Sequence, residues 1–433
     1  MSPKPKSRCE AIREENSARC SPEQNTQTEA FTGRGSVNQK KVTDWATDFD
    51  FLDPAWVENP YSIWNELRSK CPIAHSARYM GVYLPTRYVE VREIALDTEH
   101  FSSRRPALRE GLAPVPPAPP LTTDPPAHQP QKNALLPFFT TEAIARYRSQ
   151  TQAICRELIG RLAGKNNCDA ATDFAQEIPT GVTACMLGIS AQLGDLFRKW
   201  IHDFFEVGIT DQGTLHRTYT EVRTFFAEEI RKRRAAPRDD LISHLIDARI
   251  AGQPLSDDDV NSTLRLLLFA GIDTTWSAIG CCLWHLATHE EDRKRLVAEP
   301  QLIPTAVEEF LRAYAPVTAA REVVKERQIN GCHFKKGETV LLAFPAANRD
   351  PERFPDAERV VVDRTPNPHV AFGVGIHRCL GARLATMEMT VALQEWLRCI
   401  PEFTLTPGAV VQWTKGQVRG PRQLPLVIGV TRS

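Results

Sequence analysis

The chain has 433 residues and carries 53 basic against 53 acidic side chains, a balance that gives no signal for binding nucleic acid or an anionic membrane. No run of about eighteen apolar residues is present, so we expect no transmembrane helix. The eleven cysteines show no repeated metal-ligand spacing, which favours a reducing, cytoplasmic location over a disulfide framework.

The N-terminal segment differs from the rest of the chain. Residues 1–42 are polar and charged and contain little that could form a core, so we expect a disordered tail. The folded part should therefore be residues 43–433. By length alone, a segment of this size suggests two or three domains.

Two proline-containing stretches come next. Residues 104–120 hold prolines at a density that excludes regular helix and indicates an irregular loop. Asp124-Pro125-Pro126 then precedes a short predicted helix that carries His128 and Lys132. These two side chains are one helical turn apart, so both can point the same way. Considered alone, they could equally lie on a solvated helix face.

A long helix is predicted from Ser256, an N-cap with an acidic residue three positions later, to about His289. It would be roughly 50 Å long at 1.5 Å per residue. Because it is apolar nearly all round, it should run through the interior. Its middle nevertheless contains Asp273 and Thr274. A buried aspartate is costly unless it has a partner, so this polar group indicates either a satisfied core network or a functional site.

The sequence Glu309-x-x-Arg312 places two opposite charges on one helix face. Such a pair is common in surface helices, where it contributes roughly a few tenths of a kcal/mol. Further on, Asn330-Gly331 is a hairpin turn signal, and residues 339–344 form a predicted strand.

Residues 371–381 read Ala-Phe-Gly-Val-Gly-Ile-His-Arg-Cys-Leu-Gly and precede a predicted helix. Free N–H groups and a helix start would hold Cys379 as a thiolate, since that end of a helix favours negative charge. The loop would therefore present a soft anionic sulfur to a metal, beneath a flat surface. The alternative is an ordinary buried cysteine on a glycine-rich turn.

This loop resembles the haem-binding loop of the cytochrome P-450 family. The resemblance extends from about Trp45 to the C-terminus. Within the loop, His377 stands where arginine is usual in the family. The matching positions, all of which should contact the cofactor, are Phe372, Gly373, Gly375, His377, Cys379 and Gly381.

The resemblance implies one domain over residues 43–433 with a mainly α fold, small β-sheets and a long central helix crossing a buried haem b. Cys379 would be the axial iron ligand, and its thiolate would favour O–O cleavage. His128, Lys132 and Arg321 would contact the haem propionates. Lys132 replaces the usual arginine, which exchanges a bidentate fork for a point charge.

The same resemblance assigns roles around the long helix. Thr274 would order dioxygen and water, and Asp273 would supply protons. Residues 104–120 would fold over the substrate pocket, and Gln417 would also reach it. The predicted substrate contacts are Leu266, Phe269, Ala270, Val317 and Val418.

A structural role is implied for Glu309 and Arg312, which would form a buried pair behind the haem loop. The family adds a third arginine further along the chain. In this sequence we assign that position to Arg359.

These features predict a haem-thiolate monooxygenase that inserts one oxygen atom of dioxygen into a small, largely apolar organic substrate. Electrons would come from a ferredoxin and its reductase, docked on the cysteine side near Arg378. We expect a cytoplasmic monomer with no nucleic-acid partner and no membrane span. The alternatives are a peroxygenase or isomerase acting on peroxides, and a non-enzymatic haem-based gas sensor or ligand carrier.

Overall fold

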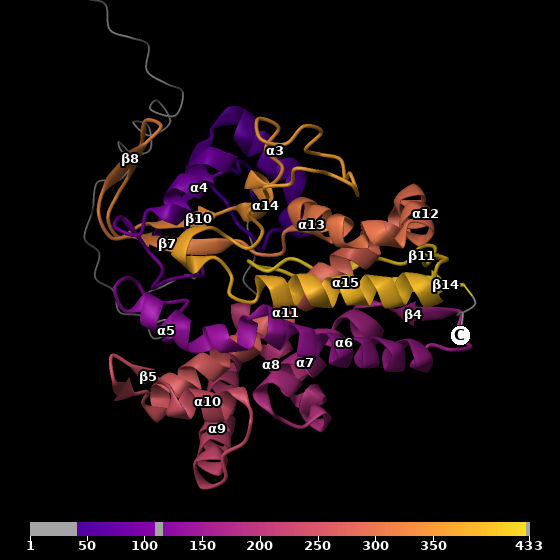
Figure 1. The fold of residues 1–433 in the computed structure, drawn as a ribbon. Helices are drawn as coiled ribbons and strands as arrows, with labels where there is room; N and C mark the ends of the chain where they lie inside the picture. Colours follow the sequence, from indigo (N-terminus) through magenta and orange to yellow (C-terminus); the bar gives the residue numbers. More distant parts are fainter. Residues whose placement is uncertain (1–40, 109–115, 430–433) are drawn as a thin grey trace, which may run out of the picture.

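The computed structural model describes residues 41–108 and 116–429 (Figure 1). The predicted tail therefore lies outside the described residues except for its last two positions. The helices are α2 (Pro54–Glu58), α3 (Pro60–Lys70), α4 (Tyr88–Leu96), α5 (His128–Leu135), α6 (Thr141–Arg161), α7 (Glu177–Leu187), α8 (Gly194–Phe205), α9 (Gln212–Ala235), α10 (Leu241–Asp247), α11 (Asp257–Thr288), α12 (Glu290–Ala298), α13 (Ile303–Tyr314), α14 (Phe344–Ala347) and α15 (Ala382–Cys399). The strands are β1 (Ile73–Ser76), β2 (Val82–Pro85), β3 (Phe101–Ser102), β4 (Asn167–Asp169), β5 (Arg249–Ile250), β6 (Gln253–Pro254), β7 (Ala319–Val323), β8 (Arg327–Ile329), β9 (Cys332–Phe334), β10 (Thr339–Leu342), β11 (Phe403–Leu405), β12 (Gln412–Trp413), β13 (Pro421–Gln423) and β14 (Pro425–Ile428).

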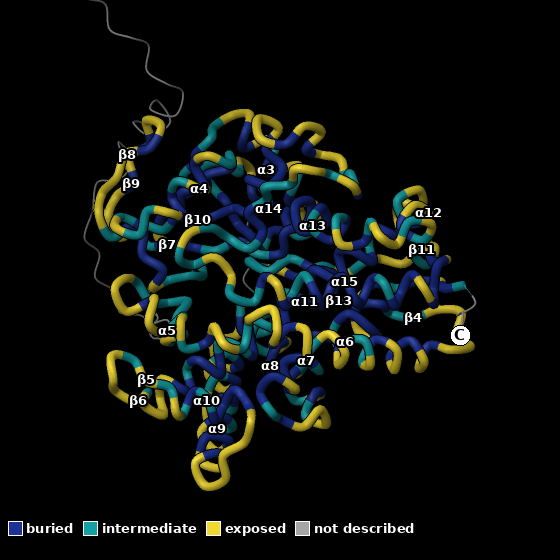
Figure 2. Tube along the Cα trace, in the orientation of Figure 1, coloured by how far each residue is buried: buried dark blue, intermediate teal, exposed yellow. Residues whose placement is uncertain are grey.

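Helix α11 is the predicted long helix. Its 32 residues begin after Ser256, whose hydroxyl oxygen accepts a hydrogen bond from the backbone N–H of Asp259 at 3.1 Å. The helix is long and apolar enough to cross a membrane, but 72% of its most apolar window is buried inside the protein. Figure 2 shows it running through the dark blue interior. It is therefore a core helix, as its apolar surface predicted.

Helices α6, α7, α11 and α15 pack together, and α9 and α10 lie on one side of this layer (Figure 1). The five-stranded sheet has the order β1-β2-β10-β7-β3, in which β10 runs parallel to β2 and the other pairs are antiparallel. Mainly α structure with small sheets is thus confirmed.

The hairpin β12–β13 packs directly on α11. A Cβ atom at Gly420 would overlap Ser277 of α11, so only glycine fits at this approach. Likewise, a Cβ at Gly280 of α11 would lie 2.7 Å from Cγ of Pro421. The loop before β13 also contacts the segment between α13 and β7, because Val418 pairs with Val317 in an isolated β-bridge.

The buried ion pair on α13 is confirmed, but its predicted third member is wrong. Arg312 Nε lies 2.7 Å from Glu309 Oε2, and both side chains have 0% exposure. Arg364, not Arg359, completes the cluster, with Nε 3.0 Å from the same oxygen. Arg359 contributes only its backbone carbonyl, which accepts a hydrogen bond from Arg312 Nη2 at 2.7 Å. The segment between α14 and α15 has no helical or strand periodicity, so the sequence did not reveal which arginine turns inward.

Candidate active site

A cavity of about 960 Å³ lies between α11, the 371–381 loop, α5 and β7. Fifteen of the predicted site residues line it. Gly375, Glu309, Arg312 and Arg359 are outside the lining. The lining residues that the sequence predicted are His128, Lys132, Leu266, Phe269, Ala270, Asp273, Thr274, Val317, Arg321, Phe372, Gly373, His377, Cys379, Gly381 and Val418.

The cysteine loop is held by its own backbone. The N–H of Cys379 donates to the carbonyl of Phe372 at 2.8 Å, which closes the loop on itself. Gly373 and Gly375 have φ of 68° and 71°, in the left-handed region that favours glycine. Burial raises the pKa of the Cys379 thiol, while a hydrogen bond from the Gly381 backbone opposes this rise. The loop thus presents the sulfur to the cavity with a backbone donor beside it.

Lys132 holds the same loop from the side. Its Nζ donates to the carbonyl oxygens of Ile376 at 2.5 Å and Arg378 at 3.0 Å. The sequence predicted that Lys132 would contact a propionate. The structure instead places its ammonium on two loop carbonyls, so it supports the loop that carries Cys379.

Two histidines and an arginine also line the cavity, close to the cysteine loop. The rings of His128 and His377 are 4.4 Å apart in an edge-to-face contact. His128 Nδ1 and His377 Nε2 are buried and hydrogen-bond to no described residue. Burial, followed by the nearby cation of Arg321, lowers the pKa of His377 to about 3, so its imidazole is neutral. Burial also lowers the pKa of Arg321 to about 10, which leaves it charged at neutral pH.

The polar middle of α11 contains a buried network whose partner residues the sequence did not identify. Asp273 Oδ1 accepts a short hydrogen bond from Arg422 of β13. Arg422 also donates through Nε to Glu206 at 2.7 Å and through Nη1 to Ser277 at 3.1 Å, and its guanidinium lies 3.8 Å from the ring centroid of Trp276. Asp273 therefore has the partner that its burial requires, supplied by a strand 149 residues further along the chain.

The hydrogen bonding of the Asp273 carboxylate is nevertheless incomplete. Its second oxygen, Oδ2, is buried and hydrogen-bonds to no described residue. Burial raises the pKa of the carboxyl to about 6, an effect that Arg422 opposes and Glu206 reinforces. Asp273 can therefore hold or release a proton near neutral pH, which suits a group that transfers protons.

Thr274, the next residue, donates its hydroxyl to the carbonyl of Ala270 at 2.7 Å. This bond to the preceding turn uses a carbonyl of the helix itself and leaves the hydroxyl oxygen facing the cavity. Asp273 and Thr274 thus stand side by side in the cavity wall.

Aromatic residues and irregular loops close the cavity away from Cys379. Phe269 stacks on Phe204 of α8, with ring centroids 4.2 Å apart. Gln417 accepts a hydrogen bond from the backbone N–H of Leu108 at 2.5 Å and donates to the carbonyl of Thr318 at 3.0 Å. Gln417 thereby joins the C-terminal loop to the proline-rich segment, whose residues 106–108, 116–118 and 120 line the cavity. Residues 109–115 of that segment are outside the described part.

Glu388 of α15 is another cavity-lining residue that the sequence did not suggest. It is buried, and its Oε2 has no hydrogen-bond partner among the described residues. Burial raises the pKa of Glu388 to about 8, so this carboxyl is neutral at pH 7. Glu388 follows Cys379 by nine residues. The sequence signal for it is that it is the only charged residue in the stretch 384–393 of that helix.

Comparison with known proteins identifies the family. A family model described as Cytochrome P450 matches residues 190–410. The mycinamicin IV hydroxylase/epoxidase of Micromonospora griseorubida is 32% identical over 382 residues, which cover 84% of this chain and 94% of that protein. The chain belongs to the cytochrome P450 family. The vitamin D(3) 25-hydroxylase of Pseudonocardia autotrophica is also a similar P450, 31% identical over 90% of this chain and 98% of the relative. Among solved structures, cytochrome P450 CYP109Q5 from Chondromyces apiculatus superposes with a TM-score of 0.81 at 31% identity, covering 90% of this chain and all of that one.

Membership in the P450 family makes the protein a haem-thiolate monooxygenase with haem b as its cofactor. The residues present fit that cofactor. Cys379 faces the cavity, the unpartnered nitrogens of His128 and His377 lie at its edge, and the guanidinium of Arg321 beside them bonds only to the carbonyl of Ala320 within the described chain. These groups are the donors that haem propionates would require.

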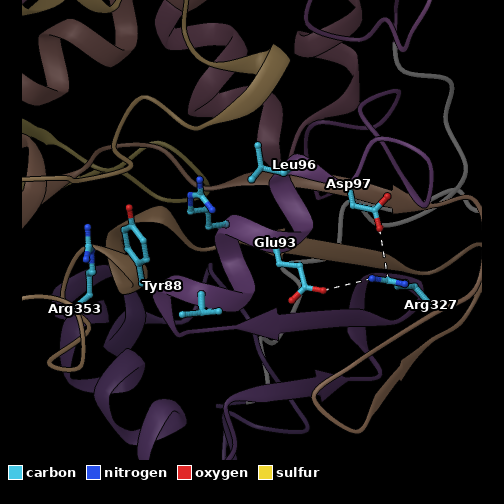
Figure 3. Close-up of a pocket in the computed structure, with 8 residues that line it drawn as sticks. Tyr88, Glu93, Leu96, Asp97, Arg327 and Arg353 are labelled. Atoms are coloured by element: carbon cyan, nitrogen blue, oxygen red, sulfur yellow. Dashed lines mark ion pairs between the residues drawn. The ribbon is translucent and has the colours of Figure 1, made fainter.

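A second hollow, of about 790 Å³, lies on the outer face of this P450 along α4 (Figure 3). There Arg327 pairs with Glu93 at 3.6 Å and with Asp97 at 3.7 Å. Leu96, on its rim, packs close to Gly375 of the cysteine loop. None of the predicted site residues lines this hollow, and we assign it no part in the reaction.

Proposed function

We propose that in this P450 Cys379 would supply the thiolate that holds the haem iron, and that Asp273 and Thr274 would deliver protons for the reaction. The observation that carries the proposal is the shared cavity, which Cys379 and the 270–274 segment of α11 both line. Haem b, when bound, supplies the activation of dioxygen, which the thiolate's electron density favours. The chain's own residues then hold the cofactor, exclude water and move protons.

The cofactor-holding role falls on the edge groups. His128 and Arg321 would donate to the propionates, and the neutral imidazole of His377 would add a third donor. Lys132 would act indirectly, by fixing the loop carbonyls on either side of His377. We propose that residues 43–433 form this single catalytic unit.

Proton transfer would begin at Asp273. A carboxyl with a pKa of about 6 can hold a proton on Oδ2, which has no other described partner, and release it toward the cavity. Arg422 keeps Oδ1 occupied and so orients the carboxyl. Thr274 would hydrogen-bond to dioxygen in the cavity when its hydroxyl leaves the carbonyl of Ala270. A peroxide-driven reaction would not need this pair, which favours dioxygen as the co-substrate.

The thiolate assignment is tested by the absorption of the reduced protein with carbon monoxide. Wild type should show the far-red-shifted Soret band of a thiolate-bound haem, and Cys379→Ser should lose it. Cys399→Ser, at the buried thiol that ends α15, is the matched control and should retain the band. A normal band in Cys379→Ser would disprove the assignment.

The proton-delivery assignment is tested by coupling. Thr274→Ala should consume electrons while forming less product and more hydrogen peroxide. Thr263→Ala is the matched control, because Thr263 makes the same bond to the preceding turn of α11 (2.9 Å to Asp259) but does not line the cavity. Equal coupling in both variants would contradict the assignment.

We propose that the two electrons come from another protein, a ferredoxin with its reductase. Arg378 and Arg383, exposed on either side of Cys379, supply positive charge for an acidic partner. Arg378→Glu with Arg383→Glu should slow reduction and remove its salt dependence. Arg231→Glu, at an exposed position on the distant α9, should not. Reduction that is insensitive to salt in wild type would exclude electrostatic docking.

The substrate is proposed to be a largely apolar organic molecule handled in the cytoplasm by a monomeric enzyme. Apolar side chains dominate the part of the cavity above Cys379, including Leu266, Phe269 and Val317. The names of two similar proteins refer to mycinamicin IV and to vitamin D(3). A spin-state titration with such compounds tests this class.

A further inference from the structure

Arg265 is a positively charged residue in the lining of a mainly apolar cavity. It lies on α11 nine residues before Thr274 and lines the same cavity, together with Ser262 and with Tyr219 of α9. Arg265, Phe269 and Asp273 follow one another at four-residue spacing and so share one side of the helix. The phenylalanine in the middle stacks on Phe204. Arg265 therefore lies beyond this aromatic wall, in the part of the cavity farther from Cys379.

The contacts of Arg265 are all with neutral groups. Its Nε donates to Asn261 Oδ1 at 3.1 Å and its Nη2 to Ser262 Oγ at 2.7 Å. The guanidinium carbon lies 4.3 Å from the centroid of the Tyr219 ring, a cation–π contact. Within the described ranges, no carboxylate forms an ion pair with Arg265. Yet the residue is only 6% exposed.

A charge buried to this degree is costly unless it is paired. The acidic group that acts on it at longer range, Asp258, is exposed and pairs with Arg223 at 3.5 Å. Two other arginines of the cavity are buried. Arg422 pairs with Asp273 and Glu206, whereas Arg321 bonds only to the carbonyl of Ala320 and is assigned above to the haem propionates. Arg265 is therefore the buried cavity arginine for which neither the described chain nor the proposed cofactor offers an anion.

We propose that Arg265 binds the carboxylate of an apolar organic acid, with the hydroxyl of Ser262 completing the site. A planar guanidinium suits a planar carboxylate, and the ring of Tyr219 limits the space above it. The rest of the acid would extend along Leu266 and Phe269. Nine residues of helix separate the anchor from Thr274, about 13 Å along the axis, so oxidation falls far from the carboxylate.

This inference rests on the proposed function, because the cavity is assumed to receive the substrate. The test titrates the haem-loaded enzyme with tetradecanoate and with lithocholate, each against its methyl ester, and follows the spin-state change of the Soret band. In wild type at least one acid should bind about 10- to 100-fold more tightly than its ester, the range expected for hydrogen bonds to a charged group. In Arg265→Gln that preference should vanish through weaker binding of the acid, while binding of the ester stays the same. Arg265→Lys should restore part of it.

Arg223→Gln is the control, since it removes a neighbouring exposed cation that does not line the cavity. It should keep the preference for the acid. The proposal is wrong if wild type prefers neither acid to its ester, or if Arg265→Gln weakens acid and ester equally. The carbon monoxide band is recorded for every variant. Loss of that band in wild type would overturn the proposed function itself, whereas a normal band without acid preference removes only the carboxylate site.

Discussion

Two buried carboxylate–arginine clusters in this P450 differ in how completely they are satisfied. Around Glu309 both oxygens accept hydrogen bonds, from Arg312, Arg364, the Val361 backbone and Asn367. Around Asp273 one oxygen binds Arg422 and the other has no described partner. Only the second cluster lines the cavity. A carboxylate whose two oxygens are both hydrogen-bonded, like Glu309, stabilises the structure. A carboxylate with one oxygen unpartnered, like Asp273, can also exchange a proton, so only the second cluster is suited to the reaction.

The saturated cluster should dominate stability. Arg312→Ala leaves the fully buried carboxylate of Glu309 without its main partner, which costs about 3–5 kcal/mol of unfolding free energy. Urea unfolding measures the loss, and haem content should fall with it. If Arg312→Ala unfolds at the wild-type urea concentration, the contrast between the two clusters is wrong.

The unsaturated cluster should instead make stability depend on pH. The pKa of Asp273 is raised from 3.8 to about 6, so the native state binds more protons than the unfolded state between these values. Stability should therefore fall as pH rises through that window, by up to about 3 kcal/mol. Comparing wild type with Asp273→Asn at pH 4 and pH 7 isolates this contribution. A difference that is constant with pH would contradict the raised pKa.

Asp273→Asn should also slow product formation about 100-fold, the lower range for loss of a general acid. Its folding stability at pH 7 should not decrease, because the amide avoids a buried charge. Ser277→Ala, which removes another hydrogen bond to Arg422, is the matched control and should lose much less activity. Similar losses in both variants would mean that the network acts only by positioning Arg422.

The smallest effects should separate the two arginines near α13. Arg364→Ala removes hydrogen bonds to Glu309 and should cost about 1–3 kcal/mol. Arg359→Ala should stay within about 0.5 kcal/mol, since only its backbone carbonyl is used. Thermal unfolding of the two variants under one condition ranks them. The reverse order would restore the sequence-based assignment.

Local spacing explains which features could be predicted. Cys379 and its glycines, Glu309 with Arg312, and Asp273 with Thr274 are each defined within a few residues, so the sequence locates them. Arg422 meets Asp273 only because β13 packs on α11, and no short-range pattern encodes that approach. Arg364 lies in an irregular segment without periodicity, which is why Arg359 was chosen instead. For Lys132 the sequence predicts a propionate contact, whereas its acceptors are two backbone carbonyls of the cysteine loop, which no local pattern indicates.

The fit of Gly420 against Ser277 has a consequence for engineering this enzyme. The loop that carries Gln417 and Val418 into the cavity is attached to α11 at a point where no side chain larger than hydrogen can be inserted. A mutant library aimed at new substrates can therefore randomise position 418 freely. It should leave position 420 unchanged, because any replacement there would displace the whole loop and with it Arg422. Such a variant would combine altered substrate selectivity with a loss of coupling between electron use and product formation.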